Sequence, residues 1–494
     1  MTHIQRTCSE RPLGVGRWAR RRTSQMELLM RLYLINPANP LAYANKGRWW
    51  GRFIVWKPLG LLVVAGLTPR DWDTTVIDEN LGVPDYASMP RPDLVGITAF
   101  TSQAVRAYQV AGLFRGLGVP VVMGGIHASM CPAEALERVD AVVTGEAEST
   151  WGQVLEDVRQ HNLQRVYAGT HLEMTHSPLA RHDLLPTGYR LGSVQTTRGC
   201  PLNCTFCSVT AFNGGRFRHR PIASVVAELA AIRERQVLIV DDNLVGTRED
   251  HIARAKDLFR AMIQADLGKR WIAQATINMA DDDELLRLAA KAGCCGVFIG
   301  LESPTAEGLL EVRKRFNVVK GSDLRGSVGR IQRNGIAVLG SYMIGLDVDE
   351  PGIGRCIADA ADRCRLDAIN VTFMTPLPGT ALWRQMEGDG RILVHAFPED
   401  WRYYTLSFPV ARHMHLSWAD LLDEREACVR GFYSAPRMAH RVCRSLGRIR
   451  SPLSTLISVG ANVAHSERTL RFYRQAAEGL DLSRGAAMVP KEPT

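Results

Sequence analysis

The sequence predicts an α/β protein in three parts: an N-terminal doubly wound sheet domain, a partial (β/α)6 barrel and a mostly helical C-terminal extension. Short apolar runs alternate with helical segments at the spacing of parallel sheets that carry helices on both faces. The alternation stops after a Pro-Leu-Pro-Gly turn at 376–379, and only helix-like periodicity follows. A chain of 494 residues has room for about two or three domains.

Composition narrows the class of protein. Apolar residues make up 46 % of the chain and charged residues 22 %, as in ordinary soluble globular proteins. No window approaches the roughly 18 uninterrupted apolar residues of a membrane span. The 11 cysteines are dispersed apart from one triplet and one adjacent pair, so we expect a reducing cytoplasm rather than a secreted disulfide framework.

The distribution of basic charge leaves several partners open. The net charge of +9 is compatible with nucleic acid, a membrane surface or an anionic substrate. Residues 1–27 are polar and rich in arginine, which predicts a disordered leader. Residues 430–474 contain nine arginines and a single acid, Glu467. This run is either a solvated basic face on helices or a peripheral surface for anionic lipid.

The N-terminal domain is expected over residues 28–160. Its expected strands are 28–36, 74–78, 93–100, 119–124 and 140–145, and its expected helices are 57–67, 102–117 and 150–160. Ligands of such sheets bind at the C-terminal ends of the strands. The candidate binding residues at these ends are Thr98, Ser102, Gly124, Gly125, His127, Gly145 and Glu146. Small residues there let a bulky ligand approach the backbone.

A second strand–helix series follows a polar linker at 161–190, whose four histidines match no compact metal-ligand spacing. The series occupies 191–380, and the C-terminal extension occupies 381–494. The expected strands are 191–197, 237–241, 271–276, 296–301, 336–343 and 368–374, with helices at 222–235, 248–265 and 282–292. Six strand–helix units predict a partial barrel whose active site lies at the C-terminal ends of its strands.

The most informative motif is the triplet Cys200, Cys204 and Cys207, spaced C-x3-C-x2-C directly after the first barrel strand. Three thiolates can hold three irons of a [4Fe–4S] cluster, whose usual protein set is four cysteines. The missing fourth thiolate leaves one iron open to a small molecule, as in a catalytic metal site. The alternative is a structural zinc site with His219 as the nearest fourth ligand, although structural zinc prefers paired C-x2-C elements.

With Phe206 between its last two cysteines, the triplet resembles the motif of the radical S-adenosylmethionine enzymes. The resemblance implies that S-adenosylmethionine chelates the open iron through its amino and carboxylate groups while its adenine lies against Phe206. One electron from the cluster then cleaves the carbon–sulfur bond and yields a 5′-deoxyadenosyl radical. An electron donor such as flavodoxin or ferredoxin is the expected partner.

Further candidates for contact with S-adenosylmethionine follow the barrel strands: Asp241, Asn243, Gln274, Glu302 and Tyr342. Glu302 resembles the strand-end glutamate of that family, and the strand with Tyr342 resembles the apolar strand beside the adenine. An acid at a strand end is also commonly a helix cap, so each signal alone is weak. Their shared position after strands strengthens the set.

The N-terminal domain resembles the Rossmann-like cobalamin-binding domain that precedes the barrel in one large subfamily. The matching runs are Gly-Gly-Ile-His at 124–127 and Gly-Glu-Ala-Glu at 145–148. The Asp-x-His-x-x-Gly signature of other cobalamin proteins is absent, because 36–40 reads Asn-Pro-Ala-Asn-Pro. Cobalamin is therefore expected without a cobalt ligand from that motif. His127 is interpreted as a supporting or structural histidine.

The run at 374–383 and the aromatic segment after it resemble the extension of members that methylate hopanoids and bacteriochlorophyll precursors. The expected function is a cobalamin-dependent radical C-methyltransferase acting on an unactivated carbon of a small, hydrophobic or natural-product substrate. The alternatives are a cobalamin-dependent cyclase or rearrangement enzyme and a non-catalytic metal-binding module. An RNA methylthiotransferase would need three more cysteines upstream, where only Cys8 and Cys131 occur, so nucleic acid is not an expected partner.

Overall fold

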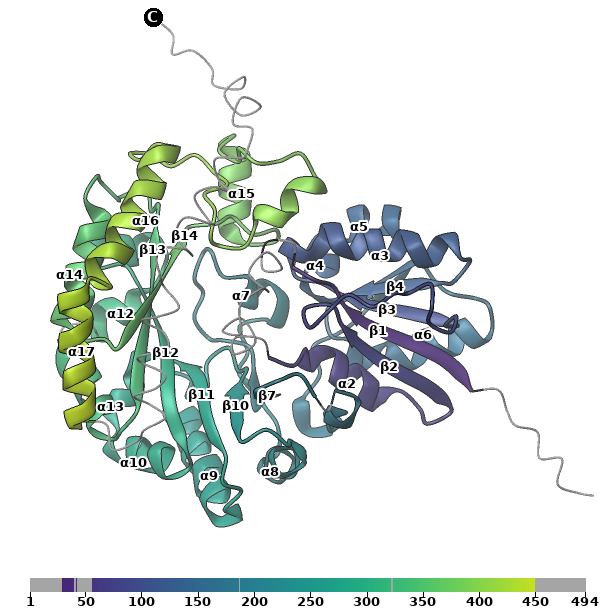
Figure 1. The fold of residues 1–494 in the computed structure, drawn as a ribbon, viewed down its shortest axis with the longest axis horizontal. Helices are drawn as coiled ribbons and strands as arrows, with labels where there is room; N and C mark the ends of the chain where they lie inside the picture. Colours follow the sequence, from purple (N-terminus) through teal and green to yellow (C-terminus); the bar gives the residue numbers. More distant parts are fainter. Residues whose placement is uncertain (1–28, 40, 42–55, 186, 321–322, 449–494) are drawn as a thin grey trace, which may run out of the picture.

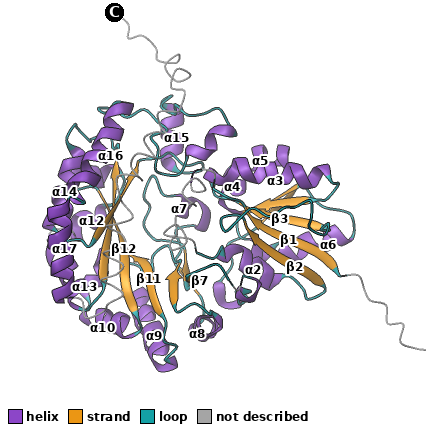
Figure 2. Ribbon diagram, in the orientation of Figure 1, coloured by secondary structure: helices purple, strands orange, loops and turns teal. Residues whose placement is uncertain are grey.

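Two parallel six-stranded sheets organise the part of the chain described by the computed structural model, residues 29–39, 41, 56–185, 187–320 and 323–448 (Figures 1 and 2). The N-terminal sheet has the order β2-β1-β3-β4-β5-β6. Its strands are β1 (Met30–Asn36), β2 (Trp72–Asp78), β3 (Leu94–Thr98), β4 (Val121–Gly124), β5 (Ala141–Thr144) and β6 (Val166–Ala168). The strand order reverses between β1 and β3, which is the topological switch point where doubly wound sheets bind ligands.

Helices cover both faces of this sheet, which confirms the doubly wound prediction. One face packs against α2 (Leu59–Leu67) and α6 (Trp151–Arg159). The other face packs against α3 (Ala104–Gly116), α4 (Gly125–Met130) and α5 (Pro132–Arg138). Because both faces are buried, the strands are nearly continuous apolar runs, which is why the sequence revealed them.

The segment 161–190 differs from the polar linker that the sequence suggested. It contributes β6 to the edge of the N-terminal sheet, and its Ala180, Leu185 and Tyr189 are buried in the core beneath α2 and α6. The strand is only three residues long and buries only Tyr167. That is too short a stretch for an alternating pattern to stand out.

The second sheet, in the order β14-β13-β12-β11-β10-β7, is the predicted partial barrel. Its strands are β7 (Leu191–Val194), β10 (Gln236–Ile239), β11 (Arg270–Ala275), β12 (Cys294–Glu302), β13 (Ala337–Ile344) and β14 (Ala368–Phe373). The covering helices include α8 (Ile222–Ala231), α9 (Glu249–Ala265), α10 (Asp283–Lys291), α13 (Leu324–Arg333) and α14 (Ile353–Arg363). All five strand pairings are parallel, so the C-terminal strand ends meet at one mouth.

The C-terminal extension joins the two domains. Its α16 (Trp418–Phe432) and α17 (Ala435–Arg448) lie against α14 on the outside of the barrel (Figure 1). Between α15 (Ala381–Gly388) and α16 the chain is mostly irregular apart from the short helix η8 (Glu399–Tyr403). That segment packs its aromatic side chains against the N-terminal domain.

The basic run of the extension is partly neutralised within the protein. Arg437 pairs with Asp359 at 2.8 Å, and Arg441, which is 1 % exposed, pairs with Asp362 at 2.9 Å. The described part of this run is therefore not a free basic face, and residues 449–474 lie outside the described structure. In the described part of the chain, no helix has both the length and the apolar character needed to cross a membrane.

Candidate functional site

The cysteine triplet lies on a loop closed by a small antiparallel hairpin of β8 (Thr197–Arg198) and β9 (Arg218–His219). Gly199 begins the loop with φ +86°, and a Cβ there would lie 2.2 Å from the Arg216 carbonyl oxygen. The Asp242 carboxylate accepts hydrogen bonds from the Gly199 amide at 2.9 Å and the Asn213 side chain at 3.0 Å. Asp242 thus fixes the start of the loop, a role that the sequence analysis missed.

The thiols sit in a buried site that disfavours free thiolates. Burial raises the pKa of all three cysteines, that of Cys204 to about 12. Iron must therefore displace the protons, and metal binding supplies the free energy for it. Asn243, just after β10, lies near enough to Cys200 for its side chain to lower the pKa of that thiol by hydrogen bonding. Its buried Nδ2 has no other hydrogen-bond partner among the described residues.

The arrangement does not favour the zinc alternative. No three histidine, cysteine or acidic side chains among the described residues are grouped so as to hold a single ion. Cysteines of a [4Fe–4S] cluster bind separate irons, so their sulfurs need not converge on one point. His219 is exposed, and its charged surroundings are Arg254, Glu173 and Asp250 rather than the cysteines.

A buried ion pair lies at the end of β12, close to the cysteines. Glu302 Oε1 is 2.5 Å from Lys314 Nζ, and a Cβ on Gly300 would lie 2.2 Å from the same oxygen. Glu302 has φ +66°, and backbone held in this region is often found at functional sites. Burial opposes the charge of Lys314, but the Glu302 carboxylate, with the nearby cysteines, outweighs it and raises the pKa of Lys314.

Lys314 is a second residue that the sequence analysis missed. It follows α11 (Ala306–Glu311) in an Arg-Lys-Arg run that has no strand-end position to identify it. Its ammonium and the Glu302 carboxylate together complement the carboxylate and amino groups of an amino-acid ligand. Only the acidic half of this pair lies at a strand end and could be predicted from the sequence.

Phe206 lies in an apolar cluster that links the cysteine loop to the C-terminal extension. Its neighbours in this cluster are Val312, Met343, Leu346, Met374, Leu382, Met386, Ala411 and Ile392. Tyr342, which the sequence placed beside the adenine, instead lies on the helix-facing side of β13 in the barrel core and is 1 % exposed. Met343 takes the position near Phe206, because successive side chains of a strand point to opposite faces.

Of the other barrel candidates, Asp241 is buried within the protein and Gln274 is exposed. Asp241 is fully buried, and its oxygens accept hydrogen bonds from the Thr196 amide at 2.6 Å and the Thr196 hydroxyl at 2.5 Å. Burial raises its pKa to about 6. Asp241 therefore holds the turn after β7. Gln274 is exposed on the face of β11 opposite the buried Trp271, Ala273 and Ala275.

In the N-terminal domain, Thr98, Gly124, Gly125 and Gly145 meet at the ends of β3, β4 and β5. A Cβ on Gly125, which has φ +86°, would lie 2.5 Å from the Thr98 hydroxyl. The Ser102 hydroxyl accepts a hydrogen bond from Asn39 Nδ2 at 3.3 Å, which ties the loops after β1 and β3 together at the switch point. These residues thus form one edge, as predicted.

His127 turns away from this edge. It is fully buried, and its Nε2 is 2.9 Å from the Tyr108 hydroxyl, which donates to Glu134 at 2.6 Å. Trp401 of the C-terminal extension donates to the same carboxylate at 2.9 Å. Burial opposes the charge of Glu134, but its hydrogen bonds from these three side chains lower its pKa. The placement agrees with the interpretation of His127 as a structural histidine.

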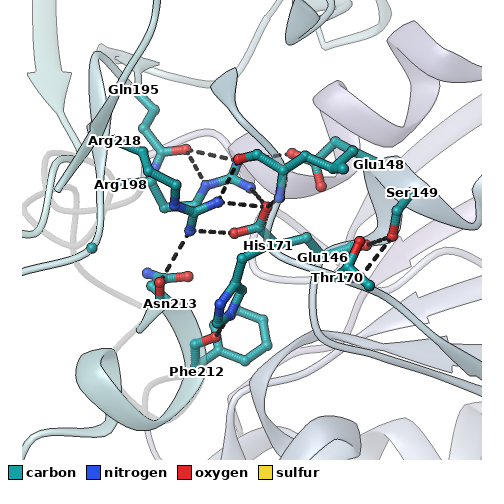
Figure 3. A network of polar contacts seen from close by, with 12 residues as sticks. Glu146, Glu148, Ser149, Thr170, His171, Gln195, Arg198, Phe212, Asn213 and Arg218 are labelled. Carbon is teal, nitrogen blue, oxygen red and sulfur yellow. Dashed lines mark hydrogen bonds and ion pairs between the residues drawn. The ribbon is translucent and has the colours of Figure 1, made fainter. Parts of the chain in front are cut away.

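Glu146 also faces protein rather than open space (Figure 3). Its carboxylate lies 2.5 Å from Arg218 Nη2 and 3.2 Å from Arg198 Nη1, and both arginines belong to the hairpin around the cysteines. The neighbouring Glu148 pairs with Arg198 at 2.8 Å. The residue predicted to touch a cofactor is therefore a bridge between the two domains.

Comparison with known proteins agrees with this geometry. A model of the radical SAM superfamily matches residues 194–351, and a model of the B12 binding domain matches residues 54–155. The chain therefore contains a radical SAM domain and a B12-binding domain. The cofactors that these two domains imply are a [4Fe–4S] cluster with S-adenosylmethionine for the first and cobalamin for the second.

The relatives of this chain include methyltransferases. It is 29 % identical to an uncharacterized methyltransferase of Synechocystis over 74 % of this chain and 69 % of that protein. It is also 29 % identical to the bacteriochlorophyllide d C-12(1)-methyltransferase of Chlorobaculum tepidum, over 67 % of this chain and 74 % of the relative. The structure of the cobalamin-dependent S-adenosylmethionine radical enzyme OxsB superposes with a TM-score of 0.65. The match covers 90 % of this chain and 72 % of OxsB at 15 % identity, so it shows that the two proteins share a fold.

The residues of the two domains fit these cofactors. The cysteine loop provides three thiols, Asn243 adds an amide beside Cys200, and the Glu302–Lys314 pair complements an amino-acid group. The strand ends of the B12-binding domain provide glycines, which allow a large flat ligand to approach the backbone. At this edge His127 is fully buried, and its Nε2 is bound to Tyr108.

Proposed function

We propose that the enzyme transfers a methyl group to an unactivated carbon of a small, hydrophobic or natural-product substrate. The observation that carries the proposal is the direct contact between the cysteine hairpin and the B12-binding domain through Glu146. Two cofactor sites that share a bridge are arranged for a reaction that needs both. The bacteriochlorophyllide methyltransferase among the relatives supports the choice of methyl transfer and of an apolar substrate.

The protein's own residues have defined parts in this proposal. Cys200, Cys204 and Cys207 would hold the cluster, and the Glu302–Lys314 pair would orient the amino-acid end of S-adenosylmethionine. When bound, the cofactors supply the radical chemistry and the methyl group, while the protein supplies orientation and a dry site.

Apolar packing would keep water out of this site. Phe206 and Met343 would contact the adenine, and the apolar cluster around them lies under α15 of the extension. A low-potential electron donor of the flavodoxin or ferredoxin type completes the proposal. Contact with anionic lipid, if the substrate is membrane-borne, would draw on the basic residues after 448, because Arg437 and Arg441 are already paired.

The first test is the cofactor content of the purified protein. After anaerobic reconstitution with iron, sulfide and hydroxocobalamin, we expect about four irons per chain and the optical spectrum of bound cobalamin. A triple Cys→Ala variant should lose the iron and the ability to cleave S-adenosylmethionine. Cleavage by that variant, or a colourless protein containing zinc, would overturn the proposal.

The second test separates methyl transfer from a radical cyclisation or rearrangement. The enzyme is incubated with a reductant, apolar extracts and S-adenosylmethionine that carries a deuterated methyl group. Methyl transfer predicts a product heavier than its substrate by one labelled methyl in place of hydrogen. A product without the label, formed while S-adenosylmethionine is consumed, would favour the cyclase or rearrangement instead.

A further inference from the structure

The bridge at Glu146 connects the two cofactor-binding regions through buried ion pairs. Glu146 follows β5 at the C-terminal edge of the B12-binding domain. Arg198 lies on β8 only two positions before Cys200, and Arg218 lies on the paired strand β9. The contact therefore joins the edge expected to hold cobalamin to the loop expected to hold the cluster.

Both oxygens of Glu146 are occupied. Arg218 donates to Oε1 at 2.5 Å and to Oε2 at 2.9 Å, in a bidentate fork (Figure 3). The Leu172 amide donates to Oε2 at 3.1 Å, and Arg218 in turn donates to the Leu172 carbonyl at 2.7 Å. The carboxylate thus fixes the strand end of one domain, the connecting segment and the hairpin of the other domain.

The hydrogen-bond network continues to the cysteine loop itself. Arg218 donates to the Asn213 carbonyl at 3.0 Å, and the Asn213 side chain donates to Asp242 at 3.0 Å. The same Asp242 oxygen accepts the Gly199 amide at 2.9 Å. Glu146 is therefore linked by a continuous set of polar contacts to the peptide immediately before Cys200.

The physical character of the bridge suggests a role in geometry rather than in stability. Glu146 and Arg218 are 3 % and 2 % exposed, so both charges have lost most of their hydration. A buried ion pair is commonly no more stabilising than an apolar pair of the same shape, yet its bidentate geometry fixes orientation. Burial opposes the charge of Glu146, but Arg218 and Arg198 lower its pKa, so the carboxylate stays ionised.

We propose that Glu146 is a positioning residue that sets the distance and orientation of the cluster loop relative to the cobalamin at the strand ends. This inference rests on the proposed function, because it requires both cofactors to act on one substrate carbon. Such reactions are sensitive to geometry, since a displacement of about 1 Å can cost about 10²-fold in rate. Glu146 itself need not touch either cofactor.

The test measures the separation of the two cofactors in the full-length protein. Glu146→Gln keeps the side-chain shape and removes the charge that holds both arginines. The control is Arg216→Gln, because Arg216 also pairs across from the barrel to the connecting segment, at 2.5 Å from Glu173, but the two side chains are 76 % and 53 % exposed. Pulsed electron paramagnetic resonance then reports the dipolar coupling between the reduced cluster and the Co(II) form of bound cobalamin.

We expect a single narrow distance distribution in the wild type and in Arg216→Gln. Glu146→Gln should keep its iron and cobalamin but show a shifted and broader distribution. An unchanged distribution in that variant would overturn the inference. So would loss of cobalamin with the iron retained, because Glu146 would then be a cobalamin-binding residue.

A second variant guards against a folding defect. Glu146→Asp keeps the negative charge but is shorter by one methylene, so it should fold and still shift the distance distribution. An unchanged distribution in Glu146→Asp, if Glu146→Gln fails to fold, would overturn the inference. A wild-type protein that takes up the cluster but no cobalamin would instead overturn the proposed function, and that result is read before any variant is made.

Discussion

The barrel mouth and the strand ends of the B12-binding domain use their polar side chains in opposite ways. At the barrel mouth the Asn243 amide lies beside Cys200, and the Glu302–Lys314 pair lies close to the thiols. These polar groups gather around the cysteine loop. Polar side chains thus make the site at this mouth.

At the strand ends of the B12-binding domain, the polar candidates are used to hold the protein together. Ser102 binds Asn39, His127 binds Tyr108, and Glu146 binds Arg218. What remains for a ligand is mostly glycine and backbone. A cluster and an amino-acid group require particular side chains, whereas a broad ring system can be accommodated by the absence of side chains. The contrast explains why the first site has a strong sequence motif and the second a weak one.

The largest expected effect is the loss of the cluster when one thiol at the barrel mouth is removed. Cys204→Ala should reduce the iron from about four per chain to near zero, because two thiolates on the loop cannot retain the cluster. Cys356→Ala is the control, since this cysteine is exposed on α14. Iron and absorbance measurements after anaerobic reconstitution decide the result. Full iron content in Cys204→Ala would contradict the view that particular side chains make the site at the barrel mouth, in contrast to the strand ends of the B12-binding domain.

The second prediction concerns the buried pair at the same mouth. Lys314→Met should lower the free energy of unfolding by about 3–5 kcal/mol, because it leaves the Glu302 carboxylate buried without its partner. It should also weaken the binding of S-adenosylmethionine. Arg315→Met removes an equal charge from an exposed neighbour and should change neither property.

Urea unfolding and equilibrium dialysis measure the two effects separately. If Lys314→Met loses stability but binds S-adenosylmethionine like the control, the pair supports the fold only. The polar pair at the barrel mouth would then hold the protein together, as the polar side chains at the strand ends of the B12-binding domain do.

The C-terminal extension touches both regions, and its contact with the barrel should depend on pH. His413 Nδ1 donates to the Gly345 carbonyl at the end of β13, and burial lowers the pKa of His413 to about 4. The unfolded chain takes up this proton near pH 6.5, well before the folded protein does. Stability is therefore fully present above about pH 6.5 and is lost as the pH falls toward about 4, by about 3 kcal/mol.

Unfolding by urea at several pH values measures this contribution. His413→Gln should reduce the difference in stability between pH 7 and pH 5, whereas His415→Gln, at an exposed position two residues away, should leave it unchanged. Equal pH profiles for wild type and His413→Gln would mean that the extension does not close over the barrel through this histidine.

Local sequence was sufficient for the parts of the fold and site that local patterns encode. Both sheets follow from apolar runs that end in glycine or polar residues, and Cys200, Cys204 and Cys207 follow from their spacing. Asp242 and Lys314 were not predicted because their partners are 43 and 12 residues away in the chain, at Gly199 and Glu302. Their roles depend on the closing of the barrel, which no local pattern contains.

Two other sequence predictions differ from the structure, each for its own physical reason. The choice between Tyr342 and Met343 is a matter of one residue in a strand buried on both faces, where hydrophobicity does not indicate the facing side. Glu146 looked like a ligand-binding acid because it follows a strand. Its actual partners, Arg198 and Arg218, come from another domain more than 50 residues later.

The smallest expected effect lies at the contact of the extension with the N-terminal domain. The Trp401 indole donates to both oxygens of Glu134, at 3.0 and 2.9 Å, while its ring stacks on Phe397 with centroids 3.6 Å apart. Trp401→Phe keeps the stacking and removes the donor, so it should cost about 2 kcal/mol, as expected for a hydrogen bond to a charged group. Trp383→Phe is the matched control in the same aromatic group, because the side chains bound to Glu134 are Tyr108, His127 and Trp401. If both variants lose the same stability, ring packing alone holds the extension to this domain. A loss of stability confined to Trp401→Phe would show that the hydrogen bonds to Glu134 hold the extension to the B12-binding domain. Polar groups of this domain would then serve the fold, unlike those at the barrel mouth.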